Sequence, residues 1–140
     1  MKWQRTRYGW VVRIDLGEEI IATLQTFARD QGVRAGMISG IGAAGEVELG
    51  FFVRATREYI RRSFVGEYEI GSLTGNFSVL DGEPFPHCHV VIAGEDLVAH
   101  TGHLFRGVVT VTCEVQVITD PDLVLRVRGP GFNPLEPSGS

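Results

Sequence analysis

The stretch Pro86-His87-Cys88-His89-Val90-Val91-Ile92 holds two histidines separated by one residue in an apolar, strand-like context. Side chains two residues apart in a β-strand point to the same face. His87 and His89 are therefore expected side by side, with Cys88 on the opposite face. A third histidine, His103, follows after one turn. Three imidazoles with an open fourth position are typical of catalytic zinc sites. The sequence therefore predicts that a zinc ion (Zn2+) binds here.

The register between the two histidine stretches decides which histidine joins the pair. A short turn after Ala93 would bring His100 opposite His89, whereas a turn one residue longer would bring His103 opposite His87. A shift of one residue reverses the face on which every side chain lies. Spacing alone leaves both arrangements open, with His100 as an alternative ligand or as a solvent-facing or interface histidine.

The most regular strand pattern covers residues 108–118. Polar residues alternate there with a wholly apolar face, and Glu114 lies among the polar ones. Glu114 is the candidate for a carboxylate that orients a zinc ligand or for a tentative catalytic general base. An exposed glutamate without a role is the alternative. The apolar face consists of Val109, Val111, Cys113, Val115 and Val117.

One helix is expected, and the other elements are short strands. The helix is predicted to open at Gly17, with Glu18 and Glu19 in its first turn and Gly32 ending it. Strands are expected in the following stretches: 8–15, 33–39, 46–53, 64–70, 72–80, 87–93, 108–118 and 123–127. One helix with many strands predicts an α+β fold with a largely antiparallel sheet.

Residues 40–45 match the dinucleotide-binding pattern G-x-G-x-x-G. That motif requires a helix after the glycines, because the pyrophosphate lies at the helix N-terminus. A strand pattern follows instead, so a glycine-rich turn between two strands is the better interpretation. The boundary between the strands at 64–70 and 72–80 is expected at Gly71 or Gly75. The stretch Asp81-Gly82-Glu83-Pro84 is typical of a turn.

Length and composition limit the possible classes of protein. The 140 residues suffice for one domain, expected over residues 1–128, with a Gly/Pro/Ser-rich tail at 129–140. The sequence contains no run of about 18 apolar residues, so no membrane span is predicted. The two cysteines, Cys88 and Cys113, resemble small buried hydrophobic residues and indicate a reducing cytoplasm.

The charge argues against strong non-specific binding of nucleic acid. The net charge is −4, whereas such binding depends on cations that neutralise phosphates. Residues 54–62 contain four arginines. They could form an anion-binding patch, but a solvated hairpin is the better interpretation of so short a run.

Five motifs in order resemble the PPC (plants and prokaryotes conserved) domain family, over most of the chain from about Trp10 to Ile118. They are Gly40-Ile41-Gly42-Ala43, the stretch 66–75, Pro86-His87-Cys88-His89, Gly102-His103-Leu104 and Cys113-Glu114-Val115. The resemblance implies an antiparallel sheet with one helix, assembled as a homotrimer. It also implies three zinc ligands, which map to His87, His89 and His103. The fold is similar, in addition, to that of acetolactate decarboxylase, a zinc enzyme.

The resemblance leaves two hypotheses about function. Plant members carry AT-hook segments and act on chromatin, and stand-alone prokaryotic members are often named as candidate DNA-binding proteins. The AT-hook core Arg-Gly-Arg-Pro is absent here, and Arg126-Val127-Arg128-Gly129-Pro130 is only a partial match. The first hypothesis is a zinc-binding regulatory or DNA-associated protein. The alternative is a zinc-dependent lyase or hydrolase that acts on a small polar metabolite, so enzymatic activity stays an open question.

Overall fold

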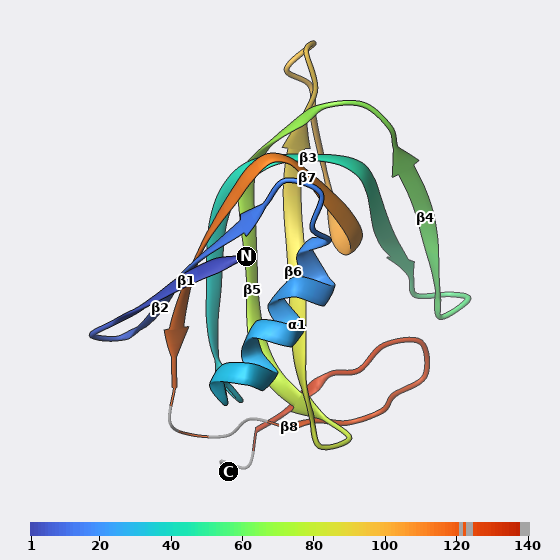
Figure 1. Ribbon diagram of the computed structural model, residues 1–140. Helices are drawn as coiled ribbons and strands as arrows, with labels where there is room; N and C mark the ends of the chain where they lie inside the picture. Colours follow the sequence, from blue (N-terminus) through green and yellow to red (C-terminus); the bar gives the residue numbers. More distant parts are fainter. Residues whose placement is uncertain (121, 123–124, 138–140) are drawn as a thin grey trace.

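The computed structural model describes residues 1–120, 122 and 125–137 (Figure 1). Within these residues one helix accompanies a single sheet in which all but one strand pair is antiparallel, which confirms the predicted α+β class. The elements are β1 (Lys2–Thr6), β2 (Gly9–Asp15), α1 (Ile20–Gln31), β3 (Gly36–Val53), β4 (Glu58–Phe64), β5 (Tyr68–Leu80), β6 (Glu83–Ala93), β7 (Ala99–Thr119), β8 (Leu125–Arg126) and β9 (Leu135–Glu136).

Four strands form a closed ring at the centre of the molecule. β3 pairs with β5 and with β7, and β6 pairs with the same two strands. β7 is long enough to contact β6 near its start and β3 along the rest of its length. The ring places residues 89–93 of β6, the histidine strand, between two paired neighbours, so the register at His89 is fixed on both edges.

The glycine-rich segment 40–45 is not a turn, contrary to the prediction. β3 runs through it without a break, with register shifts around Gly42 in its pairing to both neighbours. A Cβ atom at Gly40 or Gly42 would collide with the backbone of β7. The glycines are therefore needed for close approach of two strands at a bulge, which the sequence pattern does not distinguish from a turn. No helix follows, so the dinucleotide motif lacks its structural context.

The helix starts three residues later than predicted, at Ile20. Glu19 is its N-cap, and its carboxylate accepts hydrogen bonds from the backbone N–H groups of Ile21 and Ala22. The same carboxylate also accepts one from Gly107 of β7. Gly32 ends the helix in the left-handed conformation, as predicted. The apolar face buries Ile20, Leu24, Phe27 and Ala28, and α1 packs along β6 and β7 (Figure 1).

Two further strand predictions are corrected. β5 continues through Gly71 and Gly75, and its break from β4 falls at residues 65–67 instead. Val111 is exposed rather than part of the apolar face, because the β3–β7 register shifts between Gly42 and Ala44 and turns that part of β7 outward. The predicted turn at Asp81-Gly82 is confirmed, since both residues have positive φ in a two-residue hairpin loop.

The described part of the C-terminal segment lies against the domain. β8 pairs with β5, and β9 pairs with β8. Between them, Phe132 packs edge-on against Phe52 of β3, with 5.3 Å between ring centroids. Positions 123 and 124 of the strand expected at 123–127 lie outside the described residues, and β8 covers Leu125–Arg126 of it. The domain boundary at residue 128 stays a prediction. No helix in the described part of the chain is long and apolar enough to cross a membrane.

We expect Gly75→Ala to destabilise the protein by about 1–3 kcal/mol, the typical cost of overpacking. Gly75 lies between Ile38 of β3 and Cys88 of β6, and a Cβ atom there would overlap the carbonyl oxygen of His87. Gly71→Ala is the matched control on the same strand, because a Cβ atom at Gly71 meets no atom within 4 Å. Urea unfolding of both variants measures the difference. Equal stability of the two variants would contradict the close approach of β5 and β6.

Candidate metal centre

The loop between β6 and β7 sets the register that brings the histidines together. It contains five residues, 94–98, so that Ala93 pairs with Ala99 and His89 lies directly opposite His103. Both registers considered from the sequence are therefore wrong, because each assumed a shorter loop. Leu97, with φ 58°, donates a backbone hydrogen bond to Gly94, and this left-handed residue allows the longer turn.

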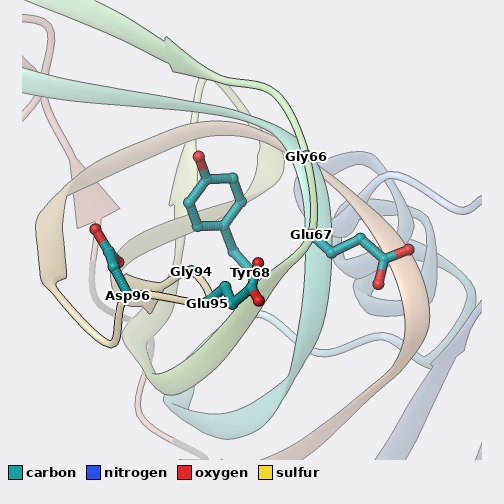
Figure 2. Close-up of a pocket in the computed structure, with 6 residues that line it drawn as sticks. All are labelled: Gly66, Glu67, Tyr68, Gly94, Glu95 and Asp96. Atoms are coloured by element: carbon teal, nitrogen blue, oxygen red, sulfur yellow. The ribbon is translucent and has the colours of Figure 1, made fainter.

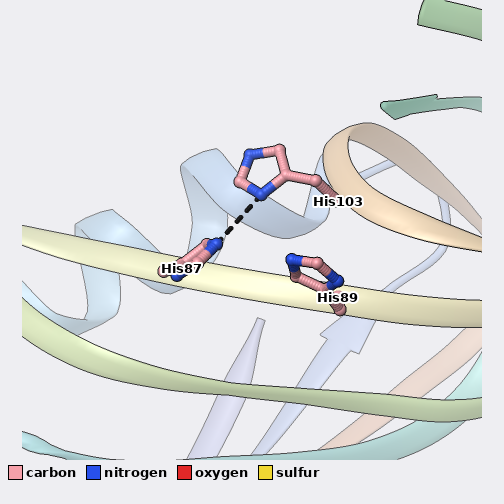
Figure 3. A group of neighbouring side chains, drawn as sticks. All are labelled: His87, His89 and His103. Carbon is pink, nitrogen blue, oxygen red and sulfur yellow. Dashed lines mark hydrogen bonds between the residues drawn. The ribbon is translucent and has the colours of Figure 1, made fainter. Parts of the chain in front are cut away.

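Three histidines converge on one face of the β6–β7 pair (Figure 3). His87 and His89 point to the same side of β6, as the alternation predicted, and His103 reaches them from β7. Nε2 of His87 lies 3.0 Å from Nδ1 of His103. One ring nitrogen from each of the three histidines lies within 4.8 Å of the others. The group is therefore compact enough to hold one metal ion.

The donor set and its spacing suit zinc. Two nitrogen ligands at 2.0–2.1 Å from a tetrahedral zinc ion lie about 3.3 Å apart. The 3.0 Å separation of the His87 and His103 nitrogens is close to that value. His89 is exposed, so its ring is free to rotate toward the other two. Imidazole is a preferred ligand of zinc, and three ligands leave a fourth position open.

A buried arginine fixes the hydrogen positions of two of the histidines. Nη2 of Arg126, on β8, lies 3.0 Å from Nδ1 of His87. A guanidinium group can only donate hydrogen bonds, so Nδ1 of His87 accepts this one. His87 then carries its hydrogen on Nε2 and donates it to Nδ1 of His103. Both rings are neutral in this arrangement, which is the form that binds metals.

Burial and nearby positive charge favour the neutral form of both rings. Burial lowers the pKa of His87 to about 4, and the charge of Arg126 and the other two histidines act in the same direction. Burial likewise lowers the pKa of His103 to about 4, with contributions from His89, Arg61 and Arg126. At neutral pH both rings are therefore uncharged, and the hydrogen between the two facing nitrogens is the one that a metal ion would have to displace.

A cavity of about 550 Å³ opens beside His87 and His103. Arg61 of β4 and Arg126 of β8 line it together with Asn76 of β5. Its walls are largely aromatic, and residues 131–135 of the C-terminal segment close one side. The cavity therefore borders two of the three histidines and is large enough to accept a small molecule.

The other candidate residues lie away from this group. His100 pairs opposite Ile92 and packs against Phe64, with 4.7 Å between ring centroids, so it is not part of the histidine cluster. Glu114 is exposed on β7 between Arg13 of β2 and Ile41 of β3. It does not line the cavity, and its role as an orienting carboxylate or general base stays a prediction.

Cys88 and Cys113 are buried hydrophobic residues, as predicted. Cys88 points away from the histidines into the core, and burial raises its pKa to about 12. Burial raises the pKa of Cys113 to about 12 as well. Neither thiol is ionised at neutral pH, so neither is prepared to act as a thiolate ligand or nucleophile.

Sequence reasoning missed Arg61, Asn76 and Arg126 as parts of the site. The arginines of residues 54–62 were interpreted as a solvated hairpin, and the β3–β4 hairpin confirms that interpretation of the backbone. However, Arg61 reaches the cavity and stacks on Phe105, with 3.7 Å between the guanidinium carbon and the ring centroid. No local pattern marks Arg126, because β8 meets β5 only through the tertiary fold.

A second hollow, of about 500 Å³, lies between the β4–β5 connection and the β6–β7 loop (Figure 2). Glu67 and Tyr68 border it from the first segment, and Glu95 and Asp96 border it from the second (Figure 2). The hollow contains acidic side chains and no histidine. It is separate from the cluster of His87, His89 and His103.

The chain matches one family model. The model of the Plants and Prokaryotes Conserved (PCC) domain, the family abbreviated PPC above, covers residues 5–120. The chain therefore belongs to this family, which confirms the resemblance found in the sequence. No curated protein matches the chain at a significant level.

Several solved structures share the fold. A candidate DNA-binding protein from Bacteroides thetaiotaomicron is 29% identical, with a TM-score of 0.92 and 96% of each chain covered. A PPC protein from Pyrococcus horikoshii is 30% identical, with a TM-score of 0.85, and the match covers 99% of this chain and 96% of that one. A metal-containing protein from Archaeoglobus fulgidus is 27% identical, with a TM-score of 0.85 and 97% of each chain covered.

We expect the metal-free protein to lose stability as the pH falls from about 6.5 to about 4. The pKa values of His87 and His103 are about 4 in the folded protein, below the ordinary 6.5 that both regain on unfolding. Between these values the unfolded chain binds more protons, so acid favours unfolding. Thermal unfolding of chelator-treated protein across this range measures the effect.

His103→Asn should reduce this pH dependence, and His100→Asn is the matched control that should leave it unchanged. His100 lies outside the cluster and its exchange leaves both buried rings in place. A melting temperature that stays constant between pH 6.5 and pH 4 in the unmodified protein would contradict the burial of neutral imidazoles.

Proposed function

We propose that this PPC-domain protein binds one zinc ion through His87, His89 and His103. The observation that supports the proposal best is the 3.0 Å separation of facing nitrogens from two different strands. The similarity to a protein described as metal-containing, from Archaeoglobus fulgidus, agrees with it. When bound, zinc would supply a Lewis acid or an activated water molecule at its open position.

Zinc binding would change the contact between His87 and Arg126. A zinc ligand cannot keep a hydrogen on the coordinating nitrogen, so the hydrogen of His87 would move from Nε2 to Nδ1. Arg126 cannot accept a hydrogen bond from that position. The Arg126–His87 hydrogen bond would therefore break on metal binding, and one N–H group of Arg126 would lose its acceptor.

The cellular role that we propose is the regulatory or DNA-associated role suggested by the names of relatives such as the Bacteroides thetaiotaomicron protein. Arg54, Arg57 and Arg62 are exposed at and near the tip of the β3–β4 hairpin, where they could contact phosphates. The net charge of −4 opposes strong non-specific binding. Direct contact with DNA would therefore need a local group of cations, and this hairpin carries one.

A zinc-dependent lyase or hydrolase for a small polar metabolite is the second candidate. It is favoured by the cavity of about 550 Å³ next to two of the proposed ligands. The homotrimer, the cytoplasmic location and a general-base role for Glu114 stay predictions from the sequence and from the resemblance.

Protein purified without any chelator should contain about one zinc ion per chain. His89→Ala should remove most of it, because two remaining imidazoles bind zinc far more weakly than three. His100→Ala, the matched control, should retain it, since His100 lies outside the cluster. Elemental mass spectrometry measures the content. Zinc that persists in His89→Ala and disappears from His100→Ala would contradict the proposed ligand set.

For DNA, we expect weak binding to a duplex at 20–50 mM salt that is lost at 200 mM, because a few arginine–phosphate contacts would carry it. Gel shifts with the protein and with an Arg54→Gln, Arg57→Gln double variant measure this. The double variant should bind more weakly at every salt concentration. Unaltered mobility of the duplex at the lowest salt would exclude the direct-contact form of the role.

A further inference from the structure

The buried charge of Arg126 is the feature of the cavity that neither the proposed zinc site nor the hydrogen bonds of the fold explain. Only 7% of the residue is exposed, and it borders the cavity beside His87. Its Nε donates to Oγ of Ser78 at 2.7 Å, and its Nη1 donates to the carbonyl oxygen of Asn133 at 2.6 Å. Its Nη2 donates to Oδ1 of Asn76 at 2.7 Å and to Nδ1 of His87.

All four acceptors of Arg126 are neutral, so they satisfy its hydrogen bonds without balancing its charge. Among the described residues, no carboxylate lies within 4.0 Å of Arg126. By contrast, the arginines that do form ion pairs have exposed side chains, for example Arg128, which pairs with Asp81. A buried charge without a counter-ion is costly, and an anion in the cavity would offset that cost.

A second cation faces the same space. Arg61 pairs with Glu48, with 2.9 Å between Nη1 and Oε1, which leaves its other N–H groups available. Its guanidinium carbon lies over the ring of Phe105, 3.7 Å from the ring centroid. Arg61 and Arg126 both line the cavity, and no acidic side chain lines it among the described residues. The cavity is therefore electropositive.

The walls indicate the rest of the ligand. Tyr59, Phe85, Phe105 and Phe132 surround the space, and the rings of Tyr59 and Phe105 lie 5.0 Å apart and nearly perpendicular to each other. Aromatic walls favour a flat, apolar body, and two guanidinium groups that line the same space favour a negatively charged group on it. A volume of about 550 Å³ lies within the range of small-molecule sites.

We propose that this cavity binds a small organic carboxylate with a flat apolar body, whose charged group lies between Arg126 and Arg61. The proposal deepens the proposed zinc function, since it names the class of ligand that would reach the open position of the metal. The binding step itself uses the arginines and the aromatic walls. It can therefore be tested in the absence of zinc.

Isothermal titration of chelator-treated protein with phenylacetate tests the proposal. Phenylacetamide is the neutral isostere of phenylacetate. Inorganic phosphate and phenyl phosphate test whether the cavity binds a phosphate group instead of a carboxylate. Phenylacetate should bind at least about ten-fold more tightly than phenylacetamide, which lacks the charge that the arginines recognise. Equal binding of the two, binding of neither, or tighter binding of either phosphate would overturn the proposal.

Variants separate the anion site from the zinc site. Arg126→Gln should weaken phenylacetate binding at least about ten-fold and retain zinc, and Arg128→Gln on the same segment should change neither. His89→Ala should lose zinc and retain phenylacetate binding. If Arg126→Gln does not fold, Arg61→Gln replaces it, because the Arg61 side chain is 56% exposed. Unchanged phenylacetate binding in the folded arginine variant would overturn the proposal, whatever the zinc content.

Discussion

The candidate site depends on the register between β6 and β7. Pairing of His89 with His103 places two imidazoles across one strand pair, and alternation along β6 adds His87 on the same face. A shift of one residue would send His103 into the core and bring an apolar side chain in its place. The five-residue loop at 94–98 thus has a direct chemical consequence, because it decides whether three nitrogens meet.

The surrounding sheet keeps that register rigid. Residues 89–93 of β6 pair with a strand on both edges, and α1 packs against β6 with Ile20, Leu24 and Phe27 on its buried face. Gly75 lets β5 approach β6 closely, and Gly40 and Gly42 do the same for β3 and β7. A metal site whose ligand backbone is already in position loses little backbone entropy on binding. The glycines therefore serve the site as well as the fold.

The sequence predicted those features that depend on local periodicity. The alternation along β6, the burial of both cysteines and the Gly32 cap follow from spacing alone, and the structure confirms each of them. The α+β class followed from the same patterns. The register of β6 on β7 could not be predicted, because it depends on loop length and on one left-handed residue, Leu97. Glycine bulges within β3 were mistaken for a turn, since both use the same residues.

Arg126 shows why the rest of the site was beyond prediction from the sequence. It is distant from the histidines along the chain and reaches them only because β8 pairs with β5. Through that contact it determines which nitrogen of His87 carries the hydrogen, and it makes the cavity electropositive. The site is therefore one electrostatic unit, in which neutral imidazoles adjoin a buried cation.

X-ray absorption spectroscopy at the zinc edge tests the central claim most directly, because it reports the atoms around the metal. For the zinc-loaded protein we predict three imidazole nitrogens and one further light atom at about 2.0–2.1 Å. A sulfur ligand at about 2.3 Å, or a shell with fewer than three imidazoles, would contradict a site built from His87, His89 and His103.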